Sequence, residues 1–164
     1  MSNDTQRTRL GDLLGLGVFV VLCLAISAIG GWVTADSIGT WYRTLQKPEF
    51  NPPDWVFAPV WSLLYLMIAL AGWRVWRRRG LAGARVAMGA YAAQLALNLA
   101  WSFVFFGGQM IGIALAEIVL LLVAIGVNAL LFWRIDRMAG WLLTPYAAWV
   151  AFASILNFAL WRLN

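Results

Sequence analysis

The sequence predicts an all-α integral membrane protein: a bundle of five transmembrane helices with a loop rich in proline and tryptophan across one end. Of its 164 residues, 63% are apolar and only 12% are charged, whereas a soluble domain usually carries about 25% charged residues. Its apolar runs approach the roughly 20 residues that a helix needs to cross a bilayer. We therefore expect a single membrane domain over residues 1–164.

The first apolar run covers residues 13–33 and follows two arginines, Arg7 and Arg9. A basic stretch before an apolar run is also typical of a signal peptide, but this run is long enough to span a bilayer. We therefore interpret it as the first transmembrane helix. The later apolar runs predict spans at residues 55–76, 81–105, 111–133 and 141–161.

Residues 34–54 are predicted to form the cap loop, which includes Trp41 and Tyr42. Prolines remove backbone donors and push the preceding residue toward extended geometry, so residues 47–53 cannot form a regular helix. Such backbone cannot face lipid, while tryptophan and tyrosine favour the membrane–water boundary. We interpret this segment as a stiff, aromatic cap over one end of the bundle.

The basic residues predict an orientation in the membrane. Nine arginines lie on the side of the N-terminus and three basic residues lie on the side of the cap: Arg7, Arg9, Arg74, Arg77, Arg78, Arg79, Arg85, Arg134 and Arg137 against Arg43, Lys47 and Arg162. By the positive-inside rule, the N-terminus faces the cytoplasm and the cap faces away from it if the protein is in an inner membrane. The net charge of +5 is thus explained by helix ends, and no nucleic-acid partner is expected.

A stripe of polar and aromatic residues follows the third predicted helix. Its members recur at steps of three and four: Tyr91, Gln94, Asn98, Trp101 and Phe105. The two amides either hold helices together by hydrogen bonds or line a cavity beneath the cap, and the sequence leaves both interpretations open.

Aromatic residues also recur at helical spacing on two other helices. The second helix carries Phe57, Trp61 and Tyr65, and the fifth carries Tyr146, Trp149, Ala153, Leu156, Asn157 and Leu160. Such stripes usually represent packing. Three of them beneath a rigid loop would also enclose an apolar pocket with a few polar groups, which is the usual composition of a small-molecule site.

One acidic residue, Glu117, lies deep within a span. A carboxylate in the membrane is costly and often marks a functional site. We expect it to be protonated or hydrogen-bonded to the third helix, and a structural and a functional role remain open.

Small residues give the third helix faces that allow close approach of another helix, and they predict a homodimer through that helix. They are Gly83, Ala87, Gly89, Ala90 and Ala93.

The chain has no histidine and one cysteine, Cys23. The commonest metal ligand and general base is therefore missing, and no disulfide within the chain is possible. We predict no metal site, no catalytic residues of the ordinary kind, no required cofactor and no axial ligation of haem iron.

A series of different short motifs is distributed over about residues 30–162. They are Trp41–Tyr42, Leu45–Pro48, Asn51–Trp55, Pro59–Trp61, Gln94–Asn98, Trp101, Phe105–Gly107, Pro145–Tyr146, Trp149, Ala151–Phe152, Leu156–Asn157 and Trp161–Arg162. Together they resemble the signature of the TspO/MBR family, the tryptophan-rich sensory proteins related to the mitochondrial translocator protein. The resemblance implies a five-helix bundle, usually dimeric, that binds porphyrins, sterol-like lipids and drug-like molecules beneath the first loop.

The resemblance also implies a set of ligand-binding residues: Tyr42, Trp61, Asn98, Trp101, Phe106, Trp149, Ala153 and Leu156. The ligand it indicates is a porphyrin similar to protoporphyrin IX, with Asn98 orienting the ring and Arg43 or Lys47 meeting its carboxylates. Two positions depart from the family pattern. Phe158 stands where the proposed sterol motif has tyrosine, and Ile113 stands where relatives often carry tryptophan.

Three functions follow as alternatives from the resemblance. The first is a membrane receptor or carrier for tetrapyrroles and related apolar ligands, with a sensory or regulatory role. The second is an enzyme that degrades porphyrins in light, with Trp61, Trp101 or Trp149 as redox partners of the excited ring. The third is a structural or regulatory membrane protein whose pocket holds only membrane lipid.

Overall fold

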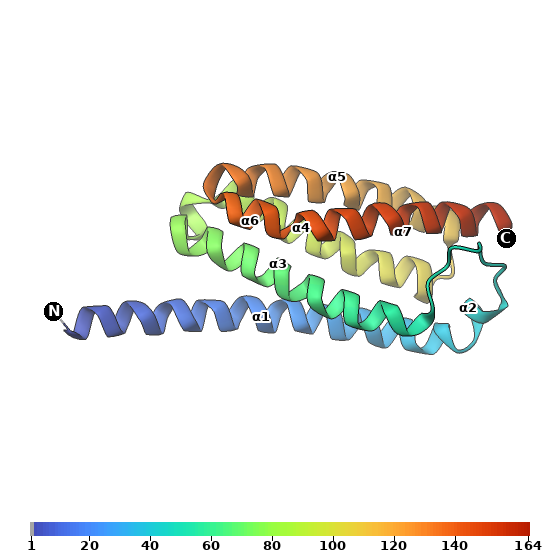
Figure 1. Cartoon of the computed structure of the whole chain (residues 1–164), viewed down its shortest axis with the longest axis horizontal. Coiled ribbons are helices and arrows are strands. Elements are labelled where there is room, and N and C mark those ends of the chain that lie inside the picture. Colours follow the sequence, from blue (N-terminus) through green and yellow to red (C-terminus); the bar gives the residue numbers. More distant parts are fainter. Residues whose placement is uncertain (1) are drawn as a thin grey trace.

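The computed structural model describes residues 2–164, and the side chains of residues 10–164. It is a bundle of long helices that run along one common axis (Figure 1). Within the described residues, five helical stretches are long and apolar enough to cross a membrane, which confirms the predicted fold class. The helices are α1 Ser2–Ile38, α2 Trp41–Thr44, α3 Asp54–Gly83, α4 Arg85–Ser102, the π-helix η1 Phe103–Gly107, α5 Ile111–Ile135, α6 Arg137–Leu142 and α7 Thr144–Leu163.

The two ends of the bundle differ in composition. One end carries the start of α1, the α3–α4 connection and the α5–α6 connection, and the arginine-rich segments lie there (Figure 1). The other end carries α2, the irregular segment 45–53 and the C-terminus. The side chains of Arg7 and Arg9 lie outside the described residues.

The first helix is longer than predicted and shortens the cap. We predicted that the loop begins at residue 34, but α1 continues to Ile38. The polar residues at this end find backbone acceptors: the Thr34 hydroxyl donates to the Gly30 carbonyl at 2.7 Å, and the Ser37 hydroxyl donates to the Phe106 carbonyl at 2.7 Å. Because these hydroxyls are satisfied, helix continues beyond the apolar run.

The other boundaries also shift by a few residues. Residues 77–80 lie between the predicted spans 55–76 and 81–105, and the chain there breaks at Gly80, whose φ of 64° lies in the region that favours glycine. Residues 134–140 lie between the predicted spans 111–133 and 141–161, yet α6 already begins at Arg137. The reason is Asp136, whose carboxylate accepts hydrogen bonds from the backbone N–H groups of Met138 and Ala139 and so caps the helix.

Asp136 also binds two arginines of α3. Its carboxylate accepts from the Arg74 guanidinium at 3.0 and 3.2 Å, and its Oδ2 lies 2.9 Å from Nε of Arg78. Burial alone would raise the pKa of Asp136, but its bonds to Arg74 and to backbone N–H groups hold that pKa below the ordinary value. This cluster fastens α3 to the start of α6.

Helices α1, α3 and α4 pack closely around Gly72 of α3. A side chain there would place its Cβ 2.7 Å from the ring of Tyr91 and 2.9 Å from the ring of Phe19. The Tyr91 hydroxyl in turn lies 3.3 Å from Sγ of Cys23 and donates to the Ile68 carbonyl at 3.3 Å. Helices α1, α3 and α4 are therefore in direct contact at this level of the bundle.

We predict that Gly72→Ala destabilises the protein by about 1–3 kcal/mol, because the added methyl overpacks a filled contact. Thermal unfolding in detergent micelles measures the effect. Gly17→Ala is the matched control, because nothing lies within 4 Å of a Cβ at that position and alanine is the better helix former. Equal stabilities of the two variants would contradict the proposed packing.

A second prediction concerns the ion cluster. At neutral pH, Asp136→Asn should lower the stability by about 1.5–3 kcal/mol, the usual contribution of hydrogen bonds to a charged group. Because the folded-state pKa is lowered, this contribution is present above the ordinary pKa of about 3.9 and is lost as the pH falls below it.

Unfolding of the wild type should therefore show a loss of stability in acid that is smaller in Asp136→Asn. Asp12→Asn serves as the control: its carboxylate lies 3.8 Å from Arg77 and both side chains are exposed, so about 0–1 kcal/mol is expected. An acid response that is unchanged in Asp136→Asn would refute this assignment.

Candidate functional site

A cavity of about 330 Å³ lies within the half of the bundle beneath the cap. Helices α1, α3, α4, α5 and α7 and the segments α2 and η1 all contribute to its wall. Asp54, at the start of α3, is the single charged residue among the described residues that line it. The wall is otherwise apolar, with a few hydroxyl and amide groups.

The structure brings all eight sequence-predicted residues to this cavity. Tyr42 comes from α2, Trp61 from α3, Asn98 and Trp101 from α4, Phe106 from η1, and Trp149, Ala153 and Leu156 from α7. The side chains therefore converge from segments that are far apart in the sequence. Sequence reasoning did not single out the contribution of α1, which consists of Ser27, Gly30, Gly31, Thr34, Ala35 and Ile38.

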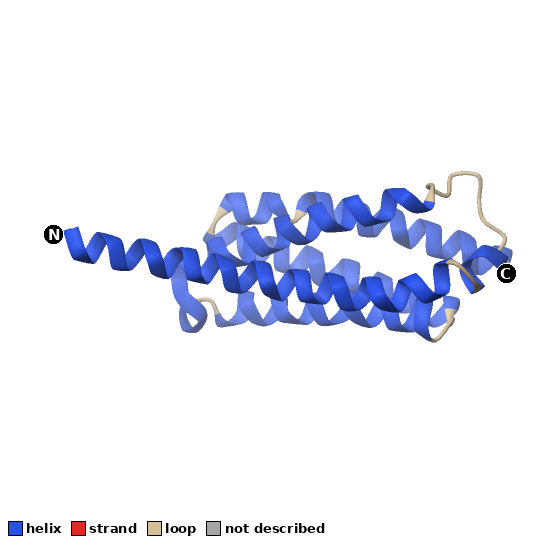
Figure 2. Cartoon of the chain, turned by 90° about the horizontal axis from the view of Figure 1, so that it is seen from below, coloured by secondary structure: helices blue, strands red, loops and turns tan. Residues whose placement is uncertain are grey.

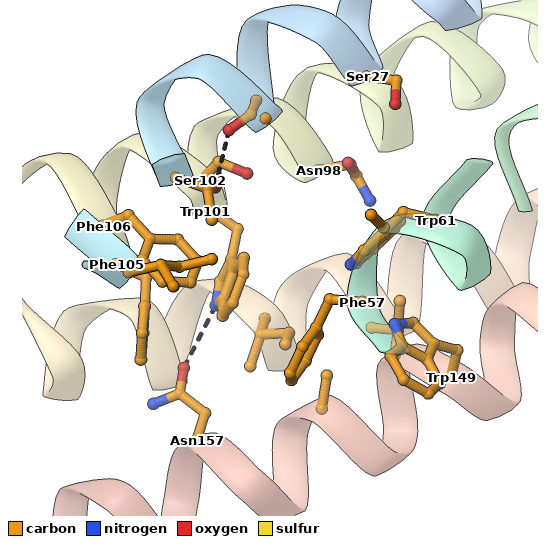
Figure 3. A pocket seen from close by; sticks show the side chains of 18 of the residues that line it. Ser27, Phe57, Trp61, Asn98, Trp101, Ser102, Phe105, Phe106, Trp149 and Asn157 are labelled. Atoms are coloured by element: carbon orange, nitrogen blue, oxygen red, sulfur yellow. Dashed lines mark hydrogen bonds between the residues drawn. The ribbon is translucent and has the colours of Figure 1, made fainter. Parts of the chain in front are cut away.

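One aromatic cluster of the wall lies at the junction of α4 and η1. Trp101 stacks on Phe105 with ring centroids 4.9 Å apart, and its plane is nearly perpendicular to that of Phe106 at 5.8 Å. In Figure 3 these three rings lie on one side of the cavity. The π-helix explains why two consecutive phenylalanines both reach it, because its wider turn closes with a hydrogen bond from the Gly108 N–H to the Phe103 carbonyl.

The opposite aromatic wall comes from α3 and α7. The rings of Phe57 and Trp149 meet edge to face, with centroids 6.0 Å apart. The ring centroid of Trp61 lies 5.8 Å from that of Tyr65 and 6.3 Å from that of Tyr146. Figure 3 shows Trp61 and Trp149 across the cavity from Trp101. Flat aromatic surfaces therefore bound the cavity from two sides.

Asn98 both joins helices and lines the cavity, so the two interpretations of the amide stripe are not exclusive at this position. Its carbonyl oxygen accepts from the Tyr65 hydroxyl, and its amide donates to the Tyr146 hydroxyl at 2.8 Å. A second pair forms nearby: the Trp101 indole donates to the Asn157 carbonyl oxygen at 3.2 Å. These bonds fix the orientation of the ring and amide groups in the wall.

Gln94 and Glu117 do not line the cavity. Gln94 is completely buried, and neither its amide nitrogen nor its oxygen has a hydrogen-bond partner among the described residues. Both carboxylate oxygens of Glu117 are likewise buried without a partner in that part of the chain. The predicted hydrogen bond from Glu117 to the third helix is therefore not seen.

The cap is held in place by side chains that contact its backbone and its rings. The Tyr42 hydroxyl donates to the side-chain oxygen Oδ1 of Asn51 at 2.9 Å, and the Lys47 ammonium lies 4.7 Å from the centre of the Tyr42 ring. Burial, reinforced by the charge of Asp54, raises the pKa of Tyr42 to about 12, so this hydroxyl stays protonated at neutral pH.

A second attachment joins the cap to the end of the chain. The Gln46 N–H donates to the Asn164 side-chain oxygen at 2.9 Å, and the Asn164 amide donates to the Gln46 carbonyl at 3.0 Å. Sequence analysis did not find Asn164, because an asparagine beyond the last helix has no pattern that distinguishes it from a solvent-exposed residue.

The described residues do not form a donor set for a metal ion. No group of three His, Cys, Asp or Glu side chains in that part of the chain is arranged to hold a metal ion. The cavity offers stacking surfaces and neutral hydrogen-bonding groups, which are suited to holding and orienting a flat apolar molecule.

The sequence profile of the TspO/MBR family matches residues 19–162. The chain is 41% identical to the tryptophan-rich protein TspO of Chlorobaculum tepidum over 157 residues, which cover 93% of this chain and 98% of that protein. It is 40% identical to the human translocator protein over 126 residues (76% and 75%) and 38% identical to the tryptophan-rich sensory protein of Cereibacter sphaeroides over 146 residues (89% of each). This multi-pass integral membrane protein therefore belongs to the TspO/MBR family, as its cap and helix motifs indicated.

Proposed function

We propose that this protein is a membrane receptor that binds a tetrapyrrole similar to protoporphyrin IX, or a related flat apolar molecule, in the cavity beneath the cap, with a sensory or regulatory role. The observation that supports this proposal best is the convergence of three indole rings, those of Trp61, Trp101 and Trp149, on one cavity. Membership of a family of tryptophan-rich sensory and translocator proteins supports the receptor-like role.

The physical properties of the wall favour a flat, largely apolar ligand. Indole and phenyl faces gain about 0.5–1.5 kcal/mol from a stacked partner beyond the burial of apolar area. The volume of about 330 Å³ lies near the lower limit of ordinary small-molecule sites, about 300–1,000 Å³. A ring system that lies between the Trp101 side and the Trp149 side would contact aromatic faces on both of its surfaces.

The polar groups in and near the cavity would orient the ligand rather than react with it. An asparagine amide has two N–H donors, and Asn98 donates one to Tyr146, which leaves the other for a ring nitrogen of the ligand. Ligand carboxylates would meet Lys47 or Arg43 at the water-facing edge of the cap. Neither cation lines the cavity, so we expect only the ends of the carboxylate chains to reach them.

A homodimer through α4 remains part of this proposal. Of the predicted small residues, Gly89 and Ala93 are exposed on this helix, whereas Ala87 is buried, Ala90 is half-buried and Gly83 is the last residue of α3. Small exposed residues of this type let two transmembrane helices approach closely.

We also propose that the cap faces away from the cytoplasm if the protein is in an inner membrane. The described arginine-rich connections lie at the opposite end of the bundle, and positive residues are retained on the cytoplasmic side.

Titration with protoporphyrin IX in detergent or nanodiscs tests the proposal. Tryptophan fluorescence of the wild type should be quenched, and Trp101→Leu should weaken binding by about 2- to 10-fold, the loss of one stacking contact. Trp133→Leu is the matched control, because this exposed ring packs at a tilt against Trp141 in the arginine-rich half of the bundle and does not line the cavity. Unchanged fluorescence of the wild type during the titration would contradict porphyrin binding.

The alternative function, light-dependent degradation of porphyrins, is favoured only by the presence of indoles in the cavity wall. Illumination of the bound porphyrin distinguishes this activity from binding alone. We expect protoporphyrin IX bound to the wild type and to Trp149→Phe to bleach at equal rates, because no protein group takes part in the chemistry. The absorption spectrum is followed over time, with free porphyrin as the reference. Faster bleaching on the wild type than on the variant would instead support light-dependent degradation with tryptophan as a redox partner.

A further inference from the structure

The cavity reaches the outside of the bundle between α1 and α3. Of the described residues that line it, those that are also exposed are Gly31 and Ala35 of α1 and Asp54, Ala58 and Ser62 of α3. The lining residues of α4, η1, α5 and α7 are all buried or half-buried. Since a residue that lines a cavity and is also exposed marks an opening, the opening lies on this one side.

The two edges of the opening are stripes of facing helices. Gly31 and Ala35 are four residues apart on α1, as are Asp54, Ala58 and Ser62 on α3, so each set lies along one helix face. Asp54 to Ser62 covers about 12 Å along the helix axis at 1.5 Å per residue. Apart from Asp54, the residues along the two edges are glycine, alanine and serine. Their side chains are too short to close the space between the helices, so a narrow slot remains.

Packing closes the slot at the end away from the cap, and the helices separate at the other end. Toward the N-terminus of α1, the two helices pack tightly at Gly72 and Phe19, and the Trp73 indole donates to the Asp12 carbonyl at 2.9 Å. Toward the cap the same helices separate, as Figure 2 shows. Asp54 follows Pro53 at the very start of α3, which places that end of the slot at the membrane–water boundary.

The slot faces the bilayer. The exposed surface of α1 beside it is apolar and includes Ile29 and Trp32, with 43% and 71% of each side chain accessible. The route from water through the cap is obstructed by comparison: Tyr42 is only 4% exposed and bonded to Asn51, and Gln46 is bonded at two points to Asn164. Passage through the slot breaks no hydrogen bond, whereas passage through the cap breaks several.

We propose that the slot between α1 and α3 is the portal of the cavity, through which a flat apolar molecule dissolved in the cap-side leaflet passes edge-on. The small residues along its edges determine the thickness of molecule that is admitted. This inference rests on the proposed function only in that the ligand is a membrane-soluble small molecule. It does not require that molecule to be a tetrapyrrole.

Thiol labelling tests the portal without any porphyrin. The reporter is Ala153→Cys, inside the cavity on α7, in a Cys23→Ser background, and the protein is reconstituted in lipid nanodiscs. An uncharged, bilayer-soluble pyrene maleimide should label the reporter, while a disulfonated maleimide of similar size should label it far more slowly. Ala35→Phe or Ala58→Phe should slow the pyrene reaction about tenfold, as a barrier raised by about 1.4 kcal/mol would.

Ala25→Phe is the matched control, because this exposed residue of α1 does not line the cavity and should leave the labelling rate unchanged. Thermal unfolding checks that each variant is folded. If Ala58→Phe fails this check, Ala35→Phe on the partner helix decides the result. Equal labelling by both reagents, or rates that the slot variants leave unchanged while Asn164→Ala increases them, would overturn the portal in favour of access through the cap.

This outcome is separable from that of the proposed function. Slot-dependent labelling in a protein that does not bind protoporphyrin IX would refute the tetrapyrrole proposal and retain the portal. If the protein binds protoporphyrin IX but the slot variants leave the labelling rate unchanged, the portal is refuted and the tetrapyrrole proposal is retained.

Discussion

The close approach of α1, α3 and α4 at Gly72 determines where the bundle is solid and where it is hollow. Because Gly72 has no side chain, the rings of Phe19 and Tyr91 rest on the α3 backbone, and the N-terminal half of α1 is fixed against its neighbours. Beyond this contact α1 and α3 separate toward the cap (Figure 2), and most of the described α1 residues that line the cavity are small: Ser27, Gly30, Gly31, Thr34 and Ala35. The cavity is therefore a consequence of helix packing as much as of the aromatic residues that line it.

Much of the fold follows from elementary properties of the sequence, and the differences have local causes. Apolar length predicts the spans, and clustered prolines predict irregular backbone at the cap, because neither property depends on distant contacts. The end of α1 was misplaced because Thr34 and Ser37 are polar, whereas in the structure their hydroxyls bond to backbone carbonyls. Asp136 was overlooked because one acid between arginines is typical of a connector, and its role depends on Arg74, 62 residues away.

The candidate site was predictable as a set of residues but not as a geometry. The family resemblance indicated the residues that line the cavity, yet the helical spacing alone did not separate Gln94, which is buried elsewhere, from Asn98, one turn away. There is a physical reason why the sequence did not predict that α1 lines the cavity. Glycine, alanine and serine line a cavity by leaving space, and a sequence pattern records the side chains that are present rather than the volume that is not filled.

The π-helix at residues 103–107 makes the lining of the cavity sensitive to the deletion of a single residue. Its turn holds an additional residue, which lets Phe105 and Phe106 both face the cavity, and the carbonyl of Phe106 is satisfied by Ser37. Loss of one codon in this segment would restore an ordinary α-helical turn, rotate the following side chains by about 100° and leave one ring in place of two. The aromatic lining of the cavity therefore depends on the length of the chain at this turn as well as on which residues stand there.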